Sequence, residues 1–392
     1  MEHPPVLFQL FAVLLAAKLG DEFFKRIGQP ALVGEILGGV VVGPALLGWY
    51  ELRPETELFA QIGAVLLLFE VGVRTRVGDI VRVGSTALGA AALGVLVPFV
   101  GGFLLGGAFG LAIEGRLFLA ASLTATSVAV SSRALASLGA LRSIAGRTIL
   151  AAAVIDDVLG LLVVGVVAGL VAGEVDLPHI GLVLMLAVAF IVIVAVAGTG
   201  ILRRQRSLLT VPRFAETPFL PGMIIMLGLA ALAAQIGLAA IIGAFMAGTV
   251  VGESAEREAL EVETTPVGAF FTPFFFGFIG AQVDPVALAN PTALLMVGSL
   301  LLVAAVTKFA GVFLGALRGG WRRAVVIGWG MVPRGEVEIV IAGLALAAGA
   351  FGHEVYAVVV AMVVLSMLLA PPLLKPLVRW AESVEPPAGE PG

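Results

Sequence analysis

Two stretches of the sequence carry the same pattern 209 residues apart. Residues 27–43 read IGQPALVGEILGGVVVG and residues 236–252 read IGLAAIIGAFMAGTVVG, with eight identities in register. Recurrent small residues are common in any membrane helix bundle, but they do not explain the matched Ile, Ala and Val. Because a repeat at a fixed distance determines the architecture of a chain, we expect two equivalent halves.

The composition around this repeat excludes a water-soluble protein. Of 392 residues, 60% are hydrophobic and only 13% are charged, and the mean hydropathy is +1.10. Soluble domains carry roughly 25% charged residues, so lipid must solvate most of this chain. A net charge of -4 without a basic stripe argues against a nucleic-acid partner, and the absence of Cys excludes thiolate sites.

Apolar segments between clusters of charge, Pro and Gly predict about thirteen transmembrane helices. With the N-terminus outside, 18 of the 23 Lys and Arg residues fall on the inner side, as the positive-inside rule requires. We therefore predict an all-α polytopic membrane protein with a cytoplasmic C-terminus and a disordered tail over 381–392. The expected spans are 6–27, 30–48, 57–75, 83–111, 116–138, 143–172, 179–203, 218–235, 237–252, 264–281, 291–317, 322–348 and 353–380.

This topology gives the two halves opposite orientations in the membrane. Spans 1–6 and 8–13 become inverted repeats, and span 7 crosses between them. Such repeats are typical of secondary transporters, whose sites lie where broken helices of both halves meet. The shift of 209 places Thr124–Ser127 on Pro333–Glu336, near the middle of two spans. Pro and Gly weaken a helix and hydroxyls satisfy freed backbone groups, so we predict two crossed discontinuous helices.

Two adjacent carboxylates, Asp156 and Asp157, lie near the middle of the span 143–172, about 20 Å from either end. Ionisable groups at this depth are costly and mark an ion path, a proton relay or an internal pair. Neighbouring helix residues point about 100° apart, so we expect one carboxylate to be paired and the other to be open to solvent. Lys308, roughly 14 Å deep in its own span, is the natural counter-ion.

The second predicted break also carries charge. Arg334 is expected to pair with Glu336 or Glu338 and so to neutralise the interrupted helix. Hard cations prefer carboxylate, hydroxyl and carbonyl oxygens, which predicts a cation site formed by Asp156, Asp157, Thr126 and Ser127 at the helix breaks.

These residues resemble the cation:proton antiporter superfamily, and within it the bacterial NapA-type sodium/proton antiporters. The resemblance runs from about residue 6 to 380 and rests on Gly28–Gly39, Thr124–Ser127 with the Asp pair, Lys308 and Pro333–Glu336. It implies a homodimer in the bacterial inner membrane. The implied parts are a dimerisation domain (1–82 and 218–282), a linker (173–217) and a core ion-translocation domain (83–172 and 283–380).

The resemblance also implies the roles of the carboxylates. Asp157 is the expected carrier of the cation and the proton, while Asp156 alternates between Lys308 and the cation. The expected function is exchange of Na⁺ or Li⁺ for H⁺ by alternating access, electrogenic and without a cofactor. A K⁺/H⁺ antiporter of the same superfamily and a cation channel on this fold remain alternatives. An intramembrane aspartyl protease would place its two Asp on separate helices, so no enzyme is expected.

Overall fold

The computed structural model describes residues 4–75, 78, 83–172, 177–198, 200, 217–284 and 290–382. Within these ranges the regular secondary structure is helical and no strand occurs. This confirms the predicted all-α class. The tail predicted to be disordered lies, apart from its first two residues, outside the described residues.

The helices fall into two sets separated by α9 (Leu177–Ile193), which continues as a π-helical turn over Val194–Gly198. The first set is α1 (Val6–Arg26), α2 (Ala31–Val42), α3 (Pro54–Arg74), α5 (Gly84–Ala108), α6 (Ile113–Ser122), α7 (Val128–Ser137) and α8 (Ile144–Ala172). The second set is α11 (Phe219–Gln235), α12 (Ala240–Val251), α13 (Arg257–Ala281), α14 (Pro291–Ala316), α15 (Trp321–Gly330), α16 (Glu336–Ala347) and α17 (His353–Glu382).

The two sets correspond helix by helix under the shift of 209 residues. Moving α2 by this distance gives 240–251, which are the bounds of α12. The same shift brings the interrupted pair α6 and α7 onto α15 and α16, and the long α8 onto α17. The predicted repeat therefore extends well beyond the two sequences that revealed it, and it includes both interrupted helices.

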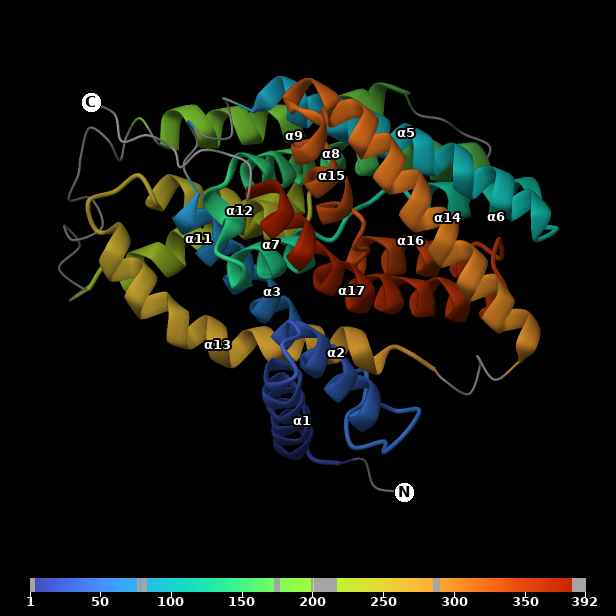
Figure 1. Ribbon diagram of the computed structural model, residues 1–392, viewed down its shortest axis with the longest axis horizontal. Helices are drawn as coiled ribbons and strands as arrows, with labels where there is room; N and C mark the ends of the chain where they lie inside the picture. Colours follow the sequence, from blue (N-terminus) through green and yellow to red (C-terminus); the bar gives the residue numbers. More distant parts are fainter. Residues whose placement is uncertain are drawn as a thin grey trace.

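Glycines let the helices α1, α2, α3, α12 and α13 pack backbone against backbone. A Cβ at Gly34 of α2 would overlap the backbone of Gly20 on α1, and one at Gly39 would overlap Gly277 on α13. Small residues serve this purpose in membranes because lipid tails remove the hydrophobic driving force between helices, leaving close van der Waals packing. Figure 1 shows α1 and α2, in blue, against α13.

The helices α5 and α14, which are counterparts in the two repeats, pack along each other. Their closest approach is again at glycine, since a Cβ at Gly315 would overlap the backbone of Gly89. Around this pair lie α6, α8, α15 and α17. The short helix α7 contacts α8 and α17 as well as α2 and α3. It therefore lies where the helices around α5 and α14 meet the glycine-packed group of α1, α2, α3, α12 and α13.

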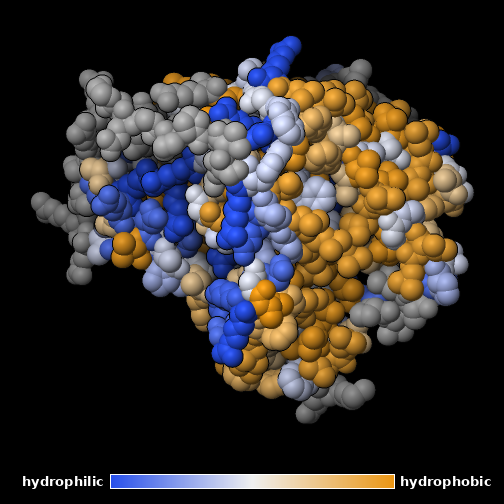
Figure 2. All heavy atoms as spheres, viewed as in Figure 1, coloured by the Kyte–Doolittle hydropathy of each residue, from blue (hydrophilic) through white to orange (hydrophobic). Residues whose placement is uncertain are grey.

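Length and composition identify membrane spans among the described helices. Seven segments are long and apolar enough to cross a bilayer: Pro54–Arg74, Gly84–Ala108, Ile144–Val171, Ile180–Gly198, Arg257–Ala281, Pro291–Gly319 and His353–Ala381. Hydrophobic residues cover most of the right-hand part of the face in Figure 2, while hydrophilic residues form a band through its centre and left. The total of thirteen spans and the orientation of the termini stay predictions.

Candidate ion-binding site at the helix crossing

The two interrupted helices meet at their non-helical segments, 123–127 and 331–335. The backbone N–H of Ser127 donates to the carbonyl oxygen of Pro333 at 2.9 Å, which joins the two breaks directly. A Cβ at Gly335 would lie 2.8 Å from the Cβ and Oγ of Ser127, so the close approach requires glycine. Both predicted breaks are therefore present, and they cross.

Lys308 of α14 reaches this crossing and pairs with Asp156 of α8. Its Nζ lies 2.9 Å and 3.0 Å from the two carboxylate oxygens and donates a third hydrogen bond to the carbonyl oxygen of Thr124. Both charged side chains are 0% exposed. Three acceptors match the three donors of an ammonium group, so its burial is compensated by hydrogen bonds as well as by charge.

Asp157, the next residue of α8, is in a different situation. Its side chain is buried, and its Oδ2 has no hydrogen-bond partner among the described residues. A carboxylate oxygen without a partner is costly inside a protein unless it takes up a proton or a cation. Of the two adjacent carboxylates, Asp156 is therefore the one matched by Lys308, and Asp157 is the one with an oxygen available to a ligand.

The hydroxyls expected at the cation site lie at the first break. Thr126 Oγ1 donates to the carbonyl oxygen of Met331 at 3.3 Å. Ser127 is the N-cap of α7, where its Oγ accepts from the backbone N–H of Val130 at 3.4 Å. Both residues are buried. These contacts engage the hydroxyls with backbone groups, and their role as cation ligands stays a prediction.

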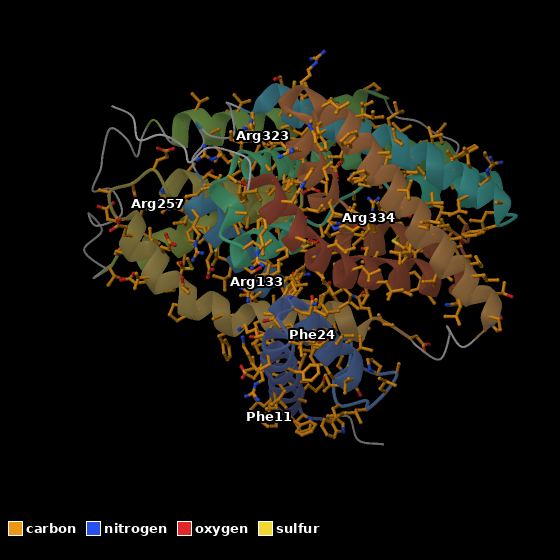
Figure 3. All side chains as sticks on the ribbon, viewed as in Figure 1. Phe11, Phe24, Arg133, Arg257, Arg323 and Arg334 are labelled. Atoms are coloured by element: carbon orange, nitrogen blue, oxygen red, sulfur yellow. The ribbon has the colours of Figure 1, made fainter. Side chains whose placement is uncertain are left out.

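The second break holds a buried guanidinium. Arg334 is 0% exposed and donates from Nη1 to the carbonyl oxygen of Ala125 and from Nη2 to that of Ala304 at 2.9 Å. Figure 3 shows it inside the helix bundle beside α14. Its Nη1 lies 4.0 Å from Oε1 of Glu338, whose Oε2 accepts from the backbone N–H of Gly335 at 2.7 Å.

Of the two acidic partners that the sequence left open for Arg334, Glu338 therefore faces the guanidinium. Glu336 is half-buried, and its Oε2 has no hydrogen-bond partner within the described ranges. Its expected role in compensating the charge of the broken helix stays a prediction. Together Lys308 and Arg334 place two fixed cations on the carbonyl oxygens of the first break, Thr124 and Ala125.

Comparison with known proteins places the chain in a family. Residues 10–380 match the family described as "Sodium/hydrogen exchanger, transmembrane". The chain belongs to this family. The sodium/hydrogen exchangers are transporters, and the chain is accordingly an integral membrane protein of the cation:proton antiporter superfamily, as the sequence predicted.

Curated relatives of this exchanger match it along nearly the whole chain. The high-affinity Na⁺/H⁺ antiporter NhaS3 of Synechocystis sp. is 32% identical, covering 97% of this chain and 92% of that protein. The Na⁺/H⁺-K⁺ antiporter GerN of Bacillus cereus is also 32% identical, covering 94% and 95%. The sodium proton antiporter MjNhaP1 of Methanocaldococcus jannaschii, solved at pH 8, has the same fold, with a TM-score of 0.67 at 18% identity over 95% of this chain and 96% of its own.

One residue at the crossing of this exchanger was not singled out from the sequence. The Oγ of Ser366 on α17 accepts a hydrogen bond from the backbone N–H of Arg334 at 2.9 Å and donates one to the carbonyl oxygen of Val363 at 2.7 Å. Pro333 interrupts the helix, and Ser366 satisfies the N–H of the residue that follows it. The repeat contains the signal that could have found it, because the shift of 209 places Ser366 on Asp157.

Proposed function

We propose that this exchanger moves Na⁺, or Li⁺, across the membrane in exchange for H⁺, and that both ions bind in turn at Asp157. The supporting observation is the buried Oδ2 of Asp157, which has no hydrogen-bond partner in the described part of the chain, beside an Asp156 that Lys308 already neutralises. A proton and a monovalent cation each satisfy this oxygen, and each excludes the other. Competition for one carboxylate is what couples the two fluxes.

The second carboxylate supplies the charge coupling. Asp156 gives both oxygens to Lys308 in this structure, and it turns toward the cation when Na⁺ arrives at Asp157. If Asp157 and either Asp156 or Lys308 each release a proton for one Na⁺, a net charge crosses the membrane. The membrane potential then drives each cycle by about 2.3 kcal/mol per 100 mV. Exchange is electrogenic on this scheme.

Alternating access requires one group of helices to move against another. We assign 1–82 and 218–282 to a static dimerisation domain and 83–172 and 283–380 to a mobile core that carries the crossing, with 173–217 linking the halves. The glycine contacts of α2 with α1 and α13 support a rigid scaffold. Exposed apolar side chains on α1, including Leu7 and Phe11, suit lipid or a second copy. The assembly is a homodimer in the bacterial inner membrane, with the N-terminus outside.

Reconstituted protein tests this function through currents on solid-supported membranes during Na⁺, Li⁺ and K⁺ jumps at several pH values. Asp157→Asn should abolish Na⁺-driven proton movement, while Glu22→Gln, which removes an exposed carboxylate of α1, should leave it unchanged. A tenfold rise in the proton concentration should raise the half-maximal Na⁺ concentration, by about tenfold for each proton that competes with the cation. Exchange retained by Asp157→Asn would refute the assignment.

Potassium is the second candidate substrate, because the relative GerN is named a Na⁺/H⁺-K⁺ antiporter. The same measurement decides between the ions. Proton movement driven by a K⁺ jump as strongly as by a Na⁺ jump would replace sodium specificity with exchange of either ion. Flux that neither saturates nor moves protons would instead identify a channel.

A further inference from the structure

A further buried carboxylate lies away from the helix crossing. Glu35 of α2 is 0% exposed, and neither of its oxygens has a hydrogen-bond partner in the ranges that the structure describes. Two cations approach the same oxygen, Oε1. Lys18 Nζ lies 3.8 Å away and Arg133 Nη2 lies 3.7 Å away. Charge, rather than hydrogen bonding, thus holds this carboxylate.

The two cations belong to different domains of the proposed transporter, Lys18 to the dimerisation domain and Arg133 to the core. Lys18 is on α1, which packs on α2 through the Gly20 and Gly34 backbones. Arg133 is on α7, the half-helix that begins at the crossing just after Ser127. Figure 3 shows Arg133 where α7 meets the blue N-terminal helices. The same half-helix is tied to the second break, because the hydroxyl of Ser131 donates to the carbonyl oxygen of Gly330 at 2.6 Å.

A cavity lies beside this contact between the two groups of helices. Its volume is about 310 Å³, and its walls come from α1, α2, α3 and α13 on one side and from α7 on the other. The lining residues include Lys25, Ala31, Glu70, Arg133 and Ala136. The surface of α7 that faces the proposed scaffold is therefore not closely packed everywhere, and there is room for the half-helix to shift.

We propose that Glu35 is a positioning residue of the transport cycle. Through Arg133 it holds α7, and with it Ser127 at the crossing, in the orientation of this structure, and it releases Arg133 when the core domain reorients. The proposal rests on alternating access as described above. It adds the specific contact between scaffold and core that is broken and remade in each cycle.

The arrangement of the two cations fits such a contact. An N–O separation of 3.7 Å without a hydrogen bond attracts the charges but fixes no direction, so the pair can separate and form again. The pair of Lys308 with Asp156 differs, because it is closed by hydrogen bonds of 2.9 Å and 3.0 Å. When Arg133 leaves, Lys18 stays beside Glu35, since both lie on tightly packed scaffold helices. The buried carboxylate is thus never left without a cation.

The test compares two cations that face one carboxylate. Arg133→Gln removes the cation on α7, and Lys18→Gln is the matched control, which removes the one on α1. The chain has no Cys, so a single Ala136→Cys in the cavity wall reports access through its labelling rate with a membrane-impermeant maleimide. We expect Glu35→Gln and Arg133→Gln each to change the labelling rate and the maximal turnover by about threefold or more.

Three further results are expected if the pair acts as a unit. The double variant Glu35→Gln/Arg133→Gln should resemble either single variant rather than their product. Arg133→Lys, which keeps the charge, should restore labelling and turnover. Lys18→Gln leaves Arg133 on α7 in place, so it should change the labelling rate less than Arg133→Gln does. Glu35→Gln is close to isosteric, so it carries the test if Arg133→Gln fails to fold.

Unchanged labelling in Glu35→Gln, additive effects in the double variant, or an equal response to Lys18→Gln would overturn the proposal. Labelling needs no transported ion, so its result is independent of the Asp157→Asn experiment. Retained exchange in Asp157→Asn with coupled labelling effects at Glu35 and Arg133 would refute the ion site and leave the positioning contact standing. Abolished exchange in Asp157→Asn without any labelling effect at Glu35 and Arg133 would support the ion site and overturn the positioning contact.

Discussion

Replacing Lys308 with alanine should destabilise the protein strongly. The substitution leaves the carboxylate of Asp156 buried without its counter-ion and the carbonyl oxygen of Thr124 without its donor. Removing one partner of a buried ion pair costs about 3–5 kcal/mol. Both side chains are 0% exposed, so solvent screening does not reduce this value. For a chain of 392 residues, such a loss corresponds on the soluble-protein scale to a fall in Tm of roughly 4–6 °C.

Thermal unfolding in detergent, with Na⁺ absent, measures this effect. Lys375→Ala is the matched control, because its Nζ bonds the carbonyl oxygen of Gly28 at an exposed site, and it should change stability by no more than about 0.5 kcal/mol. Adding Asp156→Asn to Lys308→Ala should recover part of the loss, since the unpaired charge is then gone. Equal melting of Lys308→Ala and Lys375→Ala would refute the reasoning.

Two other substitutions test how the helices are held together. Ser366→Ala should cost about 1–3 kcal/mol and lower turnover, because the buried N–H of Arg334 loses its acceptor; Ser366→Thr keeps a hydroxyl, and equal stability of the two variants would contradict this. Gly39→Val should destabilise the protein by at least about 1–3 kcal/mol, because its Cβ overlaps the backbone of Gly277. Gly298→Ala, where a Cβ meets open space, is the control, and a comparable melting shift in both would show that the contact of α2 with α13 is unimportant.

Much of this architecture was predictable because lipid restricts what a sequence can do. Charge is so costly in a bilayer that Asp156, Asp157 and Lys308 stand out against an apolar background. The internal repeat then predicted that the second half has the same helices as the first. The matched positions of Thr124–Ser127 and Pro333–Glu336 predicted both interrupted helices. These inferences need only the depth of a residue along its span and a comparison of the chain with itself.

The remaining features depend on how separate helices are turned toward each other. Lys308 faces Asp156 rather than Asp157, and Arg334, in the break before α16, faces Glu338 in the first turn of that helix. The backbone N–H of Gly335 bonds the same carboxylate. Spacing along one helix cannot show which of two adjacent carboxylates turns toward a lysine 152 residues away. The approach of Arg133 to Glu35 is equally invisible, because it exists only once α7 is laid against α2.

Asp157 of the first half is matched by Ser366 in the second half, and this difference limits how many cations one transport cycle can carry. Both halves contribute an interrupted helix, yet the hydroxyl of Ser366 is occupied by a peptide group and has no charge to balance an alkali ion. Under the proposed mechanism, the repeat therefore duplicated the helices but not the cation-binding carboxylate. Each polypeptide carries one cation per cycle, and two polypeptides transport more only by each completing its own cycle.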